Sequence, residues 1–296
     1  MKRIQFIILL ITFLSCNNVN NDKTSQSLTK SEKELIKTFS KNLVSNINSY
    51  QYDTLRNAWH SQIFRGRVRG LTKTERNVFD YYYDKEFSRL IRNDNIELVN
   101  KLKYNDGKLY FSKIIYYPEH AEIVLSFNYQ SNIDFIKYRV QLLNGVPFLV
   151  DYYSYKNELW QSKNVTNMIR LNSRYTAGST ERQQANRCMS ESDDYLRKGD
   201  TLAALTKLYE IPISHLLGNG LSIQKINLAY NLHDTIFASV LQLEKESNNS
   251  NYISYLNAYY FNDTIAMDSV FEQLGKKLGD KNKLLDSLKT FEYFWN

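Results

Sequence analysis

The sequence predicts an α+β domain followed by an all-α domain of helical hairpins. Two observations support this. Apolar residues recur at helical spacing from residue 31 to about residue 92, and from residue 107 to 153 they recur at every second position. In the last third of the chain, a short motif around an Asp-Thr pair returns in helical surroundings. A group of helices followed by an antiparallel meander is typical of an α+β domain. A recurring helical motif indicates stacked helical hairpins.

The composition is that of a globular chain. Its 296 residues, 43% hydrophobic and 14% aromatic, suffice for two domains. The formal net charge of +7 is too mild to indicate nucleic acid as a partner. The two cysteines and four scattered histidines show no disulfide framework and no metal-ligand spacing, and no phosphate loop is apparent. We therefore expect no catalytic residue, no metal and no cofactor, and we expect that the chain is not an enzyme.

The first fifteen residues have the pattern of a bacterial secretion signal. Lys2 and Arg3 precede an apolar run over residues 6–14, and Ser15 precedes Cys16. The run is too short to cross a hydrocarbon core of ~30 Å as a helix. The segment resembles the lipobox of bacterial lipoproteins. That resemblance implies a diacylglyceryl thioether on Cys16, cleavage before it and acylation of the new amino group. An ordinary signal peptide with an incidental cysteine is the alternative.

The lipobox resemblance also implies a location. An acyl anchor would hold the chain to a membrane of the Gram-negative cell envelope. Asn17 stands where an inner-membrane retention signal has aspartate, and no acidic run follows, which favours the outer membrane and its periplasmic face. Residues 16–30 are rich in Asn, Ser and Thr and predict a flexible tether between the lipid and the first folded element.

The predicted α+β domain begins with helices. Ser31 and Glu34 match a capping box at the start of a helix, and apolar residues at positions 35, 36, 39, 43 and 47 form one face. Two more helical stretches are predicted over residues 52–64 and 74–92. The period then changes to two, and Asn144-Gly145 between alternating runs predicts a tight hairpin. We expect a curved, four-stranded antiparallel meander folded over the helices.

This order of elements resembles the NTF2-like (cystatin-like) superfamily over residues 31–172. The stretch 135–171 also resembles uncharacterised bacterial proteins in which such a domain precedes tetratricopeptide repeats. The resemblance implies a pocket between sheet and helices, which some members use for catalysis through an Asp or His and which adaptors leave filled. Asp134 and Asp151 are the nearest carboxylates, but no catalytic motif of the superfamily can be placed on them. We interpret both as strand-end or surface residues.

A basic run lies between two of the predicted helices. Arg65, Arg67 and Arg69 alternate along it, and guanidinium groups bind phosphate and carboxylate in a bidentate manner. The three arginines are candidates for contact with an anionic ligand or a lipid head group. Glu75 and Asp80 follow closely, and a solvated face or pairing of the arginines within the protein is the favoured alternative.

The repeated motif of the last third places Asp-Thr pairs at Asp200, Asp234 and Asp263. An Asp or Thr oxygen at such a turn is expected to cap the second helix of a hairpin. The pattern resembles the tetratricopeptide repeat, an antiparallel pair of helices. The resemblance implies a degenerate repeat domain over residues 181–296, with roughly three helix pairs and a capping helix over residues 281–294. Helical hairpins without this ancestry are the alternative.

Stacked repeats of this kind bind peptides or proteins on a concave surface. Candidates for a partner groove on the predicted first helices are Lys225, Asn227, Asn231 and Asn257. Two functions follow from the sequence. The favoured one is a non-enzymatic, lipid-anchored envelope adaptor that binds a protein through its helical repeats. The alternative is a small-ligand-binding protein or an enzyme that uses the NTF2-like pocket.

Overall fold

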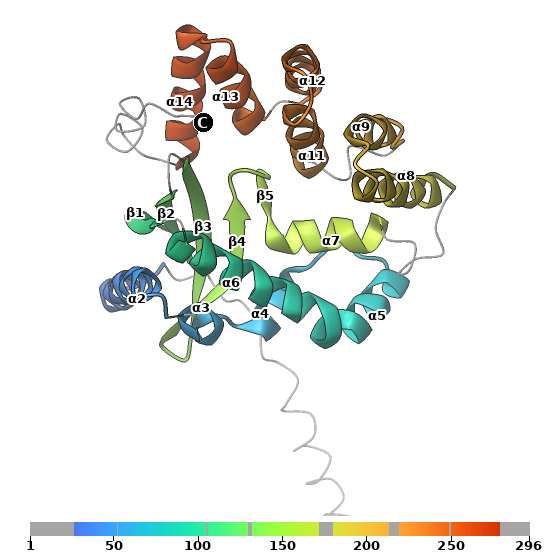
Figure 1. The fold of residues 1–296 in the computed structure, drawn as a ribbon. Helices are drawn as coiled ribbons and strands as arrows, with labels where there is room; N and C mark the ends of the chain where they lie inside the picture. The colour runs from blue at the N-terminus through green and yellow to red at the C-terminus, as the bar shows by residue number, and fades with distance from the viewer. Residues whose placement is uncertain are drawn as a thin grey trace, which may run out of the picture.

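The computed structural model describes residues 27–278, with gaps at 52, 105, 130–131, 172–179, 213–218 and 249. Cys16, most of the predicted tether and the capping helix expected over 281–294 lie outside the described residues. Within them, a five-stranded antiparallel sheet follows a group of helices and precedes a second group (Figure 1). The general kind of fold predicted from the sequence, mixed α and β followed by helices, is confirmed.

The helices before the sheet are α2 (Lys30–Asn48), α3 (Asp53–Ala58), α4 (Ser61–Arg67), α5 (Lys73–Tyr82), the π-helical turn η1 (Tyr83–Phe87) and α6 (Ser88–Tyr104). The capping box at the start of α2 lies two residues earlier than predicted. Thr29 Oγ1 accepts a 3.2 Å hydrogen bond from the Glu32 backbone N, and Glu32 Oε2 accepts one of 2.8 Å from the Thr29 N. Leu28 is buried in the core, so residues 28–30, which were expected to belong to the tether, are part of the folded structure.

The helix predicted over residues 52–64 is wrong as a single element. It is divided into α3 and α4 at Trp59 and His60, because these residues pair with a strand of the sheet. The His60 backbone N donates a 2.9 Å hydrogen bond to the Leu149 carbonyl, and Trp59 forms a β-bridge with Leu149. The helical segment expected to end at residue 92 continues instead to Tyr104, the last residue of α6.

The strands are β1 (Lys108–Tyr116), β2 (Ala121–Tyr129), β3 (Asn132–Leu143), β4 (Val146–Ser154) and β5 (Leu159–Trp160), and they lie in this order across the sheet. Asn144 and Gly145 have φ angles of 52° and 78°, which is the backbone of a type I′ turn, so the predicted hairpin is confirmed. The expected meander had four strands. The short β5, which pairs with the end of β4, adds a fifth.

One face of the sheet is covered by α2, α3 and α6, and the main hydrophobic core lies between them (Figure 1). Ile36, Leu43 and Leu55 fill it from the helices, and Tyr138 and Leu149 fill it from the strands; all five are buried. On the opposite face, α7 (Gln161–Leu171) lies against β4, and a second core joins α4, α5, η1 and α7.

A single side chain joins the end of α2 to the edge of the sheet. Asn48 Nδ2 donates a 2.8 Å hydrogen bond to the Leu109 carbonyl, and Asn48 Oδ1 accepts one of 2.7 Å from the Leu109 N. The amide group therefore pairs with both backbone groups of one residue of β1.

The helices after α7 are α8 (Thr180–Arg197), α9 (Thr201–Tyr209), α11 (Asn219–Tyr230), α12 (Asp234–Ser247), α13 (Asn251–Tyr260) and α14 (Thr264–Leu278), which we call the helical array. They form the hairpins α8/α9, α11/α12 and α13/α14. Asp200 and Asp263 cap α9 and α14 as expected, each accepting a 2.9 Å hydrogen bond from a backbone N three residues on. The expectation is wrong for Asp234, which is the first residue of α12. There His233 Nδ1 is the cap and accepts from the Thr235 N at 3.3 Å.

The helical array returns to the sheet at its last hairpin. Glu158, in the turn between β4 and β5, accepts hydrogen bonds from the backbone N of Asn251 at 2.6 Å and of Tyr252 at 3.2 Å, at the start of α13. Phe271 of α14 packs against Val124 of the sheet in a separate apolar cluster. The last hairpin is thus fixed to the face of the sheet opposite the main core.

Candidate functional site

The space between the sheet and α2, α3 and α6 is where the NTF2-like resemblance implies a pocket. Buried apolar side chains fill it, and Tyr138 has no exposed surface. The buried charged residues in the described part of the chain are Glu75, Glu122, Asp151, Lys225 and Glu244, and each of them lies elsewhere. This face of the sheet therefore serves as a core, and in the described part of the chain it buries no Asp, Glu, Lys or Arg side chain.

Asp151, interpreted from the sequence as a strand-end or surface residue, is fully buried on the other face of β4. Its Oδ2 accepts hydrogen bonds from Ser162 Oγ at 2.6 Å and from Arg67 Nε at 3.2 Å, and its Oδ1 accepts one from the Ser162 N at 3.1 Å. Burial raises the pKa of this carboxyl, although the Ser162 hydrogen bonds and the Arg67 charge oppose the rise. Asp151 joins β4 to α4 and to the first turn of α7. The side chain of Asp134 lies outside the described part of the structure.

The three alternating arginines do not point to one place. Arg65 is paired with Asp80 at 2.8 Å, and Arg67 is paired with Asp151. Arg69 is exposed, and its carbonyl accepts a 3.3 Å hydrogen bond from Thr166 Oγ1. Two of the three guanidinium groups are thus engaged inside the protein, and contact of Arg69 with an external anion stays a prediction.

A charged group on the sheet was missed in the sequence. Glu122 is buried on the face that carries Val124. Its carboxylate forms ion pairs with Lys137 Nζ at 2.8 Å and with Arg139 Nη2 at 2.7 Å. Burial alone would raise the pKa of Glu122, but the interactions with His120 and with the Lys137 ammonium outweigh burial, and the pKa is lowered. The strand register places Glu122 directly opposite Arg139. The acidic residue on one strand and the basic residues at alternate positions of the next were therefore the sequence feature that could have predicted this cluster.

The four residues expected in a partner groove are divided between interior and surface. Lys225 is buried, with its Nζ 3.0 Å from Glu244 and 4.1 Å from the ring centroid of Tyr209. Asn257 is also buried and donates to Gln242 at 3.2 Å. Asn227 and Asn231 are exposed. Lys225 and Asn257 therefore stabilise the helical array from within, and the surface candidates that remain are Asn227 and Asn231.

A contiguous aromatic surface lies where the second and third hairpins meet. Tyr230, Tyr260 and Phe261 are between 40% and 49% exposed. They are joined by ring contacts through the buried Phe237, with centroids 5.5 Å from Tyr230 and 4.9 Å from Tyr260, and the ring of Phe261 is 5.0 Å from that of Tyr260. We call Tyr230, Tyr260 and Phe261 the aromatic patch.

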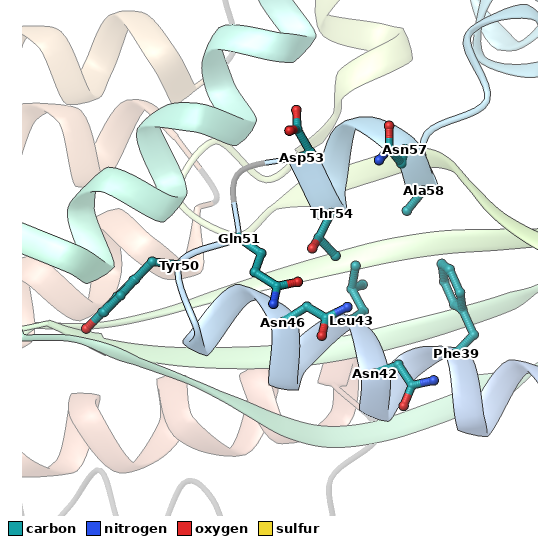
Figure 2. A pocket seen from close by; sticks show the side chains of 10 residues that line it. All are labelled: Phe39, Asn42, Leu43, Asn46, Tyr50, Gln51, Asp53, Thr54, Asn57 and Ala58. Carbon is teal, nitrogen blue, oxygen red and sulfur yellow. The ribbon is translucent and has the colours of Figure 1, made fainter.

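An open groove lies between α2 and α3 (Figure 2). Its volume is about 710 Å³, and amide and hydroxyl side chains form much of its lining. Asn42 and Asn46 come from α2, and Gln51, Thr54 and Asn57 come from α3 and the turn before it. The groove is not evident from the sequence, because its two sides come from separate helices and no motif marks them.

Metal and membrane-spanning features are absent from the described ranges. No group of three or more His, Cys, Asp and Glu side chains lies there in an arrangement that could hold a metal ion. His60 and His233 instead cap helices, and Cys188 is a buried, free thiol. No helix in those ranges is both long and apolar enough to cross a bilayer.

Comparisons with known proteins add little. No protein-family model matches the chain, and no curated protein matches it. It is loosely similar to the solved structure of a phospholipid-binding protein from Ralstonia solanacearum in complex with a phospholipid. The TM-score is 0.33 and the identity is 12%, over 50% of this chain and 88% of that chain. A similarity of this size carries no argument about ligand or activity.

Proposed function

We propose that the protein is a lipid-anchored envelope adaptor that binds another protein through its helical array and catalyses no reaction. In this proposal residues 31–172 form an NTF2-like domain that supports the array, and the hairpins are degenerate tetratricopeptide-like repeats. Cys16 carries the acyl anchor, on the periplasmic face of the outer membrane. The equivalent Asp caps at Asp200 and Asp263 support a common origin of the first and third hairpins.

The observation that carries the proposal is the aromatic patch. Three aromatic side chains that are nearly half exposed and linked through the buried Phe237 are costly to leave in water, and such surfaces mark sites of protein contact. Tyr and Phe are enriched at interfaces because they bury a large area with few rotatable bonds. The exposed Asn231, next to Tyr230 in sequence, and Asn227, one helical turn before it, would supply polar groups at the rim.

Two further features support a binding role. The apolar core occupies the space in which an NTF2-like enzyme would hold its catalytic groups. The last hairpin is also fixed to the sheet by Glu158 and Phe271, so the aromatic patch is presented by a rigid support. A preformed surface loses less conformational entropy when a partner binds.

Affinity purification from detergent-solubilised envelope tests the proposal. The full chain should recover a protein partner, and the variant Tyr260→Ala/Phe261→Ala should lose most of it. Tyr104→Ala is the matched control, because Tyr104 is an exposed aromatic residue of α6, outside the array. Equal recovery by the native chain and the double variant would show that the patch is not the binding surface, and equal thermal unfolding midpoints would exclude misfolding as the cause of a loss.

A further inference from the structure

The groove between α2 and α3 has a chemistry that the adaptor function does not use. We propose that it binds a neutral carbohydrate, as a second binding site separate from the aromatic patch. The groove lies between helices before the sheet, whereas the patch lies on the helical array after it (Figures 1 and 2). The proposal therefore goes beyond the adaptor function and does not depend on it.

The asparagines of α2 are the first argument. Asparagine is a poor helix former, so its presence inside a helix calls for a compensating role. Asn48 has such a role, because its amide pairs with Leu109 of β1. Asn42 and Asn46 are four residues apart and so share one face of α2, the face that lines the groove. Within the described part of the chain, neither of their side chains makes a hydrogen bond.

The opposite side of the groove is lined by groups of the same kind. Figure 2 shows Gln51 and Thr54 projecting toward Asn46, with Asn57 further along α3. The side chains of these three residues also make no hydrogen bond to any described residue. Each amide offers two donors and an acceptor, and the hydroxyl of Thr54 offers both functions. Neighbouring hydroxyls of a sugar ring likewise donate and accept, so they match amide groups without requiring a charge.

Aromatic rings lie at the two ends of the row. Phe39 and Tyr50 are half-buried, and each packs partly against the main core (Figure 2). An aromatic face is rich in electron density and attracts the polarised C–H groups on the apolar face of a sugar ring. Rings flanking a row of amides therefore fit a short, neutral saccharide better than a fully polar solute.

Charge and size agree with this ligand class. The one charged residue of the lining is Asp53, which lies 3.8 Å from Arg56 in an exposed ion pair. No cation of the lining is available to hold a phosphate or a carboxylate, which disfavours anionic ligands. A volume of about 710 Å³ is within the range of small-molecule sites.

The test uses the full-length protein in a detergent that has no sugar head group. Saturation-transfer difference NMR would be recorded with cellobiose, maltose, lactose and N,N′-diacetylchitobiose. At least one disaccharide should give signals at its C–H protons. The variant Asn42→Ala/Asn46→Ala should bind it about tenfold more weakly, because two hydrogen-bonding groups are lost. Phe39→Leu, which keeps an apolar group in the core, should weaken the ring-proton signals.

Lys41→Ala/Ser45→Ala is the matched control. These residues are exposed, have the same spacing on α2 and are displaced by one position from the groove face, so binding should be unchanged. The proposal is overturned if the native protein gives no signal with any of the four disaccharides, or if the Asn42/Asn46 variant binds as well as the control. It is also overturned if the native protein binds a blocked pentaglycine peptide and no disaccharide, and if the Asn42→Ala/Asn46→Ala variant no longer binds that peptide. Recovery of a protein partner should be the same in both variants, which separates this result from the adaptor test.

Discussion

Glu158 Oε1 lies 2.6 Å from the backbone N of Asn251, a residue 93 positions further along the chain. The first N–H groups of a helix have no partner within the helix, and a carboxylate there also interacts favourably with the helix dipole. A residue of the turn between β4 and β5 therefore pairs with the first turn of α13, and together with the packing of Phe271 it fixes the last hairpin to the sheet.

Replacing Glu158 should loosen the last hairpin. Glu158→Ala is expected to lower the free energy of unfolding by about 1–2 kcal/mol, because it removes two hydrogen bonds to the first backbone N–H groups of α13 and leaves the Ser250 cap in place. The φ of 49° at this position strains alanine as much as glutamate, so backbone strain cancels. Denaturant unfolding measures the loss, and hydrogen exchange should become faster in α13. Glu97→Ala, which removes an exposed ion pair with Lys101, should cost less than about 0.5 kcal/mol. Equal losses would contradict the capping role.

The two Asp-Thr turns at Asp200 and Asp234 should respond differently to the same substitution. Asp200→Ala removes the cap of α9 and should cost about 1 kcal/mol of unfolding free energy. Asp234→Ala leaves the cap made by His233 intact and should cost less than about 0.5 kcal/mol, through the helix dipole alone. Denaturant unfolding of both variants checks the difference. A larger loss at Asp234 would mean that the assigned caps are wrong.

Glu122 should make the protein sensitive to acid. The pKa of Glu122 is lowered in the folded state from its ordinary value of 4.5, so the folded state binds fewer protons than the unfolded state. The stability that this adds is present above that value and is lost as the pH falls through the folded-state pKa. Between about pH 6 and about pH 3, the native protein should lose more unfolding free energy than Glu122→Gln. Glu119→Gln, an exposed site nearby, should behave like the native protein.

Cleavage between α7 and α8 should leave two fragments that stay together. The polar sequence of residues 172–182 predicts an exposed connection, and its first eight residues lie outside the described ranges. Because Glu158 and Phe271 join the last hairpin to the sheet, the fragments should co-elute in size-exclusion chromatography after limited proteolysis. Fragments of Glu158→Ala/Phe271→Ala should elute separately. A first cut inside β1–β4 would contradict the prediction.

Cys16→Ser tests the acyl anchor. Each buried methylene contributes about 0.8 kcal/mol to membrane binding, so several acyl chains hold a protein at a bilayer almost permanently. The serine variant should appear in the soluble envelope fraction or remain unprocessed, and its mass should lack the acyl groups. Membrane fractionation and mass spectrometry measure both effects. An unchanged mass and distribution would rule out lipidation at this residue.

Local signals in the sequence predicted the fold best. Asn144-Gly145 requires two positive φ angles and so determines its hairpin without help from distant residues. The continuation of α6 was also readable, because Leu98, Val99 and Leu102 extend the helical pattern into the core. The break between α3 and α4 could not be predicted from the sequence, because it depends on the pairing of His60 with Leu149, which lies far along the chain.

The candidate sites depend even more on distant pairs. Asp151 was interpreted as a strand-end or surface residue because its partner Arg67 belongs to a different element. Lys225 looked available for a ligand because Glu244, which neutralises it, is on the next helix. The groove between α2 and α3 follows from the packing of two helices, and the sequence pattern of either helix alone does not indicate it.

The side chain of Asn48 has a consequence for association between copies of the protein. An edge strand normally offers a row of unpaired backbone groups to which a strand of another molecule can add. At Leu109 of β1 both groups are already taken by one amide, so an incoming strand would have to displace α2 to pair there. The opposite edge, β5, is two residues long. The start of β1 and the short β5 therefore offer little backbone for intermolecular strand addition, which would favour solubility where many copies are crowded together.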